Sequence, residues 1–128
     1  MKLLLDTHAF LWYCAGDAQL SDRAKSAIES GENDRFLSVA SLIEIAIKLS
    51  LGRLSISMPF ERFVADGIEQ LRCSVLHLTP THLGKLSAMP FHHRDPFDRI
   101  LVAQALVDDL DVLSIDKELD AYGIRRHW

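Results

Sequence analysis

Four carboxylic acids stand next to short apolar segments of the chain: Asp6, Glu44, Asp98 and Asp116. If the fold brings them together, their like charges raise one another's pKa values, and a divalent cation would relieve the repulsion. A site made of oxygen ligands alone favours Mg²⁺ or Mn²⁺. Such a site suits metal-assisted hydrolysis of a phosphodiester bond, because the ion polarises the phosphoryl oxygen and lowers the pKa of a bound water.

The densest group of charges is the stretch from His93 to Arg99, HRDPFDR, which runs straight into an apolar segment. Pro96 suits the first position of a helix, since that position needs no amide donor. Asp95 then becomes the N-cap, and Asp98 lies in the first turn, where a negative charge favours the helix dipole. Helix capping therefore explains this stretch locally.

Local contacts, in helix caps or ion pairs, could also explain the other three acids. Asp6 and Asp116 fit N-caps of the segments that follow them. Glu44 fits a capping box with Ser41, or an ion pair with Lys48 one helical turn later. Capping accounts for each acid separately, but it does not account for all of them meeting at one place.

Apolar runs alternate with helix-like segments along the chain. Strands are expected over residues 2–5, 36–39, 75–78 and 111–115, with a last edge strand from residue 124. Helices are expected around 10–16 and over 21–30, 42–51, 59–71, 81–86, 96–109 and 117–122. This order predicts one α/β domain, residues 1–128, with a mostly parallel central sheet and helices on both faces.

The predicted topology places the four acids at one edge of the sheet. In open α/β sheets, ligands bind outside the carboxyl ends of the strands. Asp6 ends the first strand and Asp116 follows the strand near the end of the chain, while Glu44 and Asp98 fall in the first turns of helices at that same edge. The sequence therefore predicts that four separate segments deliver carboxylates to one rim.

Composition limits the classes of function. The chain has 128 residues, a net charge of −4 and 48% hydrophobic residues, as in ordinary globular domains. No apolar run reaches the roughly 20 residues that cross a bilayer, so a cytoplasmic protein with no membrane partner is expected. Cys14 and Cys73 form no spaced metal motif, and they are expected to be reduced core thiols. The net charge predicts no basic footprint, so RNA binding would need local cations, for which Lys48, Arg94 and Arg99 are the candidates.

The sequence resembles a known family, the PIN-domain ribonucleases, and in particular the VapC-type toxins of bacterial toxin–antitoxin pairs. The matching stretches span almost the whole chain in the family's order: Leu3–His8, Ser38–Lys48, His93–Ala105 and Leu113–Asp116. The resemblance implies a Mg²⁺-dependent endoribonuclease, with Mn²⁺ as a substitute ion, that cleaves RNA by metal-activated water. It implies that Asp6, Glu44 and Asp98 are the core catalytic and metal-binding acids, with Asp116 as a more variable fourth.

The resemblance also suggests accessory residues and partners. Asp95 belongs to a variant of the family motif, and Ser114 stands where many relatives have threonine. Thr7 and Ser41 could orient carboxylates or waters, or they could serve only in turns and caps. The implied partners are an RNA substrate and a small antitoxin, whose C-terminal segment would lie in an apolar groove and point a basic side chain at the acids. A homodimer is usual in the family.

Several other functions are weighed against this one. An inactive PIN or receiver-like scaffold would bind only a partner protein. A phosphoaspartyl enzyme would suit Asp6 after a strand, but position 8 is His8 where a second aspartate is needed. The histidines lack a zinc motif such as HExxH, and the best-placed ligands are carboxylates. No GxSxG elbow is present for a serine hydrolase.

Overall fold

The computed structural model describes all 128 residues as one α/β domain built on a five-stranded sheet. The strand order is β3-β2-β1-β4-β5, and every neighbouring pair is parallel. Strand β1 therefore lies at the centre. The strands are β1 (Lys2–Leu5), β2 (Asp34–Ser38), β3 (Cys73–Leu76), β4 (Asp111–Leu113) and β5 (Arg126–His127). The prediction of a parallel α/β sheet is confirmed.

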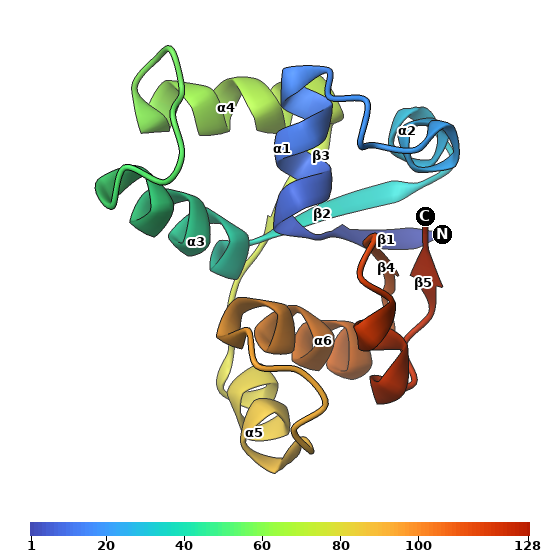
Figure 1. Ribbon diagram of the computed structural model, residues 1–128. Helices are drawn as coiled ribbons and strands as arrows, with labels where there is room; N and C mark the ends of the chain where they lie inside the picture. Colours follow the sequence, from blue (N-terminus) through green and yellow to red (C-terminus); the bar gives the residue numbers. More distant parts are fainter.

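Helices cover both faces of the sheet, as Figure 1 shows. One face carries α1 (Thr7–Ala15), α2 (Asp22–Glu29) and α4 (Phe60–Leu71). The opposite face carries α5 (Pro80–Ala88) and α6 (Pro96–Asp108). Between these layers, α3 (Val39–Ser50) follows directly from β2 at the carboxyl end of the sheet and contacts both α1 and α6. A short 3-10 helix, η1 (Lys117–Tyr122), follows β4 at the same end.

The alternation of side chains along β1 creates two cores. Leu3 and Leu5 pack in the larger cluster beneath α1 and α2, whereas Leu4 points the other way into the cluster under α6. All three side chains are fully buried. A strand that is buried on both faces has apolar residues at every position, which explains the three successive leucines before Asp6. No helix is long and apolar enough to span a membrane.

Several boundaries differ from the sequence-based predictions: β2 is Asp34–Ser38 rather than 36–39, β4 ends at Leu113 rather than 115, and α1 begins at Thr7 rather than near residue 10. Helix α3 begins at Val39, because the Ser38 hydroxyl at the end of β2 accepts the Ala40 N–H at 3.0 Å and caps the helix at once. The predicted capping box of Ser41 with Glu44 is therefore wrong, since Ser41 lies inside the helix. Strand β3 starts two residues earlier than predicted, at Cys73, because the edge strand is only partly buried and its apolar pattern is weak.

Candidate metal centre

Asp6 is fixed by the turn from the central strand into α1. Its carboxylate caps the helix by accepting the Ala9 N–H at 2.7 Å, and the residue is only 4% exposed. Burial raises the pKa of Asp6, opposed by hydrogen bonds from Ser114 and the Ala9 N–H, while the charge of Glu44 raises it further. No lysine or arginine pairs with Asp6. The capping contact uses only the Oδ1 oxygen of the carboxylate.

Glu44 lies on α3 and is held from two sides. The Thr7 hydroxyl donates to Glu44 Oε1 at 2.8 Å, and the Thr7 oxygen lies 3.0 Å from the Ser41 hydroxyl oxygen. Lys48 Nζ donates to the other oxygen, Oε2, at 2.6 Å. Thr7, Ser41 and Glu44 are all buried. The contacts place the Glu44 carboxylate against the first turn of α1, directly after Asp6.

The first turn of α6 carries two aspartates with different roles. Asp95 is the N-cap, and its carboxylate accepts the N–H groups of Phe97 at 2.8 Å and Asp98 at 3.2 Å. The Asp98 carboxylate is not used in capping. Burial raises its pKa to about 7, and the charges of Asp95, Asp6 and Glu44 raise it in the same direction. The Asp98 carboxylate is therefore close enough to Asp95, Asp6 and Glu44 for their charges to affect its pKa.

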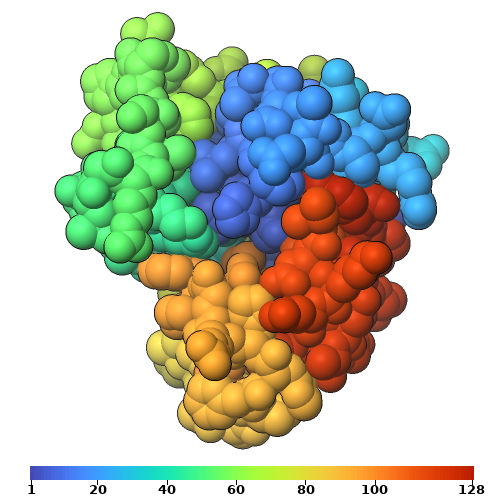
Figure 2. Space-filling model, viewed as in Figure 1, coloured from blue at the N-terminus to red at the C-terminus, as the bar shows by residue number.

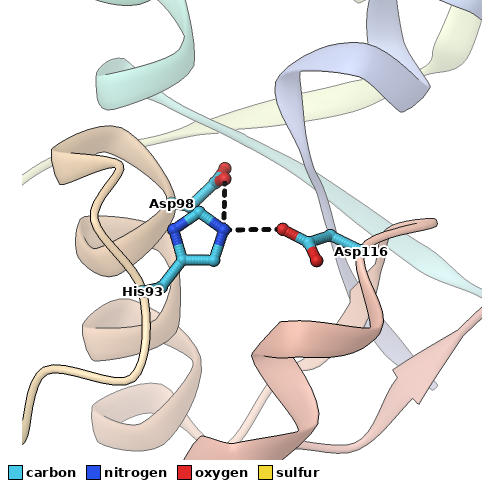
Figure 3. Close-up of side chains that lie close together, drawn as sticks. All are labelled: His93, Asp98 and Asp116. Carbon is cyan, nitrogen blue, oxygen red and sulfur yellow. Dashed lines mark hydrogen bonds and ion pairs between the residues drawn. The ribbon is translucent and has the colours of Figure 1, made fainter.

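Asp116 reaches the site from the opposite side, through His93 (Figure 3). His93 Nε2 lies 2.6 Å from Asp116 Oδ2 and 3.6 Å from Asp98 Oδ2, and ligand atoms of the three residues lie within 4.8 Å of one another. The Asp95 N–H donates to His93 Nδ1 at 3.0 Å, so the neutral ring carries its hydrogen on Nε2 and donates it to Asp116. Burial lowers the pKa of His93, but Asp116, Asp98 and Glu118 raise it above its ordinary value.

The sequence analysis gave His93 no role in the site. This residue lies in the loop before α6, but its side chain is only 12% exposed. The Tyr122 hydroxyl accepts the N–H groups of both His92 and His93, at 3.0 and 3.1 Å, and ties the loop to η1. Tyr122 lies 29 residues from His93, so no local pattern points to this contact. Asp116 also caps η1 by accepting the Glu118 N–H at 3.0 Å.

The three cations expected near the rim have three different environments. Lys48 is paired with Glu44, as described above. Arg94 is exposed and forms no hydrogen bond or ion pair. Arg99 is buried: its guanidinium donates to the Met89 carbonyl at 3.1 Å and lies 3.9 Å from the centre of the Phe91 ring. Because this side chain is turned into the domain, little of its guanidinium is exposed for the predicted contact with RNA phosphate.

Comparison with known proteins identifies the family. Residues 3–124 match the PIN domain family, nearly the whole chain. The protein is a PIN domain. Its sequence is 27% identical over 123 residues to ribonuclease VapC22 of Mycobacterium tuberculosis, covering 94% of this chain and 91% of that protein.

Solved structures share the fold of this PIN domain at low sequence identity. A chain of the VapBC2 structure from Rickettsia felis, bound to a promoter DNA fragment, matches with a TM-score of 0.73 and 11% identity, covering 99% of this chain and 98% of that one. VapC20 of Mycobacterium tuberculosis, described as a toxin that cleaves the sarcin-ricin loop, matches with a TM-score of 0.65 and 19% identity, covering 95% of each chain. PIN nucleases generally use divalent metal ions, and this PIN domain has an acidic group of the kind that such ions bind.

Two grooves of the PIN domain adjoin the acids. The first, of about 440 Å³, runs between α3 and residues 93–97 and is lined by Glu44, Lys48 and Asp95 among others. The second, of about 840 Å³, lies between α1, the segment after α3 and α4, and eight of its 14 lining residues are hydrophobic. Lys48 lines both. On the face seen in Figure 2, the segments that carry α3, α1, α6 and η1 meet at the centre of the molecule.

Proposed function

We propose that this PIN domain is a Mg²⁺-dependent endoribonuclease and the toxin of a type II toxin–antitoxin pair, acting on RNA in the cytoplasm. The observation that carries the proposal is that Asp6, Glu44 and Asp98 come from three separate elements, yet the charge of Glu44 raises the pKa values of both Asp6 and Asp98, and the charge of Asp6 also raises the pKa of Asp98. The ribonuclease VapC22 and the VapBC and VapC20 structures support the choice of substrate and of partner.

The donor set fits a hard divalent cation. Asp6 and Asp98 have no lysine or arginine partner, and both have raised pKa values although His8 lowers that of Asp6 and His93 lowers that of Asp98, so a divalent cation would stabilise both carboxylates. Carboxylate oxygens are the ligands that Mg²⁺ and Mn²⁺ prefer. An ion bound there would polarise the scissile phosphate and lower the pKa of the attacking water.

The remaining residues orient these ligands. Thr7 donates a hydrogen bond to Glu44, Ser41 contacts the Thr7 hydroxyl behind it, and Ser114 donates a hydrogen bond to Asp6. Asp116, at the far side of the group, is assigned the fourth acidic position. Of the three predicted phosphate contacts, Arg94 is the cation that is free to bind RNA, and Lys48 can do so while paired with Glu44.

The test is cleavage of purified total RNA with and without Mg²⁺ or Mn²⁺, with the new ends mapped by sequencing. We expect Asp6→Asn and Asp98→Asn to fold and to lose metal-dependent cleavage. The matched control is Asp66→Asn, which changes an exposed acid on α4 whose side chain is 55% exposed. Full cleavage by both site variants would refute the proposal.

The partner is proposed to be a small antitoxin lying in the larger apolar groove, and the toxin itself is proposed to be a homodimer. That groove reaches His8 and Lys48 beside the acids, so a bound segment could bring a basic side chain to the metal ligands. Expression of the chain alone should arrest growth of a bacterial host, and Asp98→Asn should relieve the arrest. Partner binding without any affinity for Mg²⁺ or Mn²⁺ would instead favour an inactive scaffold.

A further inference from the structure

One aromatic side chain lies in water beside the candidate metal centre. Phe91 is 83% exposed, more than any other large hydrophobic residue of the domain. It belongs to the segment between α5 and α6, which runs along the front of α6 in Figure 1. Burial in the core does not explain this phenylalanine, since most of its surface stays in contact with solvent.

The Phe91 ring is nevertheless held in place. The guanidinium carbon of Arg99 lies 3.9 Å from the ring centre, in a cation–π contact, and Arg99 is itself anchored by its hydrogen bond to the Met89 carbonyl. In the next two residues, His92 and His93, the backbone N–H groups donate to the Tyr122 hydroxyl. An exposed ring on a segment fixed at both ends is suited to binding a flat ligand, because little freedom is lost when the ligand stacks.

The surroundings of Phe91 have the chemistry of a nucleic-acid site. A hollow of about 490 Å³ is lined by Phe91, His92, His93, Arg94 and Glu118, so that Phe91 is its one hydrophobic residue. Arg94 is exposed and has no partner in the domain. His93 is the residue that bridges Asp98 and Asp116, so the hollow opens directly beside the metal centre. Protein interfaces have a contiguous apolar core, which this hollow lacks.

We propose that Phe91 is a base-stacking platform, on which one base of single-stranded RNA stacks beside the scissile phosphate while Arg94 contacts a neighbouring phosphate. Aromatic side chains interleaved with cations are the usual means of binding single-stranded nucleic acid. The inference rests on the proposed function, because it assigns part of the substrate site of that nuclease. It makes Phe91 a specificity residue, since purines stack more strongly than pyrimidines.

The test compares variants that separate stacking from packing. Phe91→Leu keeps an apolar cover over Arg99 but removes the aromatic face, whereas Phe91→Tyr keeps both. Leu83→Ala is the matched control, because Leu83 is an exposed apolar residue on α5, 48% exposed, that lines neither the hollow nor the grooves. The probes are fluorescein-labelled hexamers of adenosine and of uridine, and an adenosine hexamer that contains one 2-aminopurine. Binding is measured in the Asp98→Asn background, so that cleavage does not interfere.

We expect Phe91→Leu to weaken adenosine-hexamer binding about tenfold and to abolish the stacking-induced quenching of 2-aminopurine. Phe91→Tyr should bind within about twofold of the parent, and Leu83→Ala should bind as the parent does. Unchanged affinity of Phe91→Leu would overturn the proposal. Equal losses in Phe91→Leu and Phe91→Tyr would also overturn it, because they would indicate a distorted loop. A change confined to the oligomeric state would assign Phe91 to a protein contact instead.

Cleavage by the chain with Asp98 intact separates this proposal from the proposed function. If that protein cuts RNA and Phe91→Leu cuts at the same sites at the same rate, the platform is refuted and the nuclease stands. If it cuts no RNA but hexamer binding depends on an aromatic residue at position 91, the nuclease is refuted and the platform stands as an RNA-binding site.

Discussion

Among the acids of the site, Asp98 is the one whose pKa is raised far enough to affect the pH dependence of folding. Its pKa of about 7 means that the folded, metal-free protein holds this proton more tightly than the unfolded chain, in which an aspartate titrates near 3.8. At pH values below about 4 the proton is bound in both states. As the pH rises from about 4 through 7, the folded state loses that proton at a cost, so the stability of the metal-free protein falls across this window.

Asp98→Asn should remove this pH dependence. At pH 8 the variant should exceed the parent in free energy of unfolding by up to roughly 4 kcal/mol, which corresponds to the difference between a pKa of 3.8 and one of about 7. At pH 4 the two proteins should be nearly equal. Urea unfolding in EDTA from pH 4 to pH 8 measures the difference, and parallel stability curves would contradict the assignment.

Thr7 supplies the hydroxyl that orients Glu44, and its removal can be made almost isosteric. Thr7→Val leaves Glu44 Oε1 buried without its donor, so we expect a loss of stability of about 1–3 kcal/mol. Metal affinity should fall by roughly 10- to 100-fold, as for other residues that hold metal ligands. Calorimetric titration with Mn²⁺ measures the affinity. Thr81→Val, at an exposed position of α5, is the control and should change neither quantity.

Which site residues the sequence could predict depends on how local their contacts are. Asp6 and Asp95 cap helices within three residues of themselves, so spacing alone locates them. His93 owes its place to Tyr122 and Asp116, which lie 29 and 23 residues away and are brought near by the fold. The environment of Arg99 could not be predicted for the same reason. Helical spacing does not reveal that its guanidinium contacts the Met89 carbonyl and the Phe91 ring of the preceding loop.

At the scale of elements, the close approach of α4 to α1 depends on a glycine inside a helix. A Cβ atom added at Gly67 would lie 2.5 Å from Phe10 Cζ, and the Phe10 ring is fully buried. Glycine normally weakens a helix interior by about 1 kcal/mol relative to alanine. Close packing against Phe10 explains its presence here.

Alanine substitutions at two helical glycines should therefore change the free energy of unfolding in opposite directions. Gly67→Ala should lower the free energy of unfolding by about 1–3 kcal/mol, because Phe10 must leave its position in the core. Gly84→Ala, also within a helix, meets no atom within 4 Å and should raise it by about 0.5–1 kcal/mol. Urea unfolding of both variants measures the two effects. Stabilisation by Gly67→Ala would show that α4 has room to move away from α1.

Helices and strands could be predicted from the sequence where a strong local pattern, such as a cap or an apolar run, agreed with the tertiary structure. Pro96 after Asp95 marks the start of α6 within one residue, and the apolar run before Asp6 marks β1. The start of α3 was misjudged, because Ser38 and Ser41 are both plausible caps by type. The path of the chain decides between them, because Ser38 is the last residue of β2 and the chain enters the helix without a loop.

At the scale of the molecule, parallel strands bring four distant segments, each with a carboxylate, to one edge of the sheet. Glu44 pairs with Lys48 and Asp116 pairs with His93, whereas Asp6 has no ion pair and Asp98 has only the His93 ring at 3.6 Å, whose effect on its pKa is smaller than that of burial. A cation bound at this edge would therefore stabilise the folded chain and not the unfolded chain. By linkage, an ion at 100 times its dissociation constant adds about 2.7 kcal/mol.

This coupling predicts that saturating Mg²⁺ or Mn²⁺ raises the Tm by several degrees, since about 1 kcal/mol shifts the Tm of a domain of this size by roughly 4 °C. The rise should be larger at pH 8 than at pH 6, because the proton on Asp98 competes with the ion. Asp98→Asn should abolish most of it. NaCl at equal ionic strength is the control, since screening alone weakens the repulsion among the acids. An equal rise in NaCl, or in Asp98→Asn, would mean that the edge relaxes by screening and holds no ion.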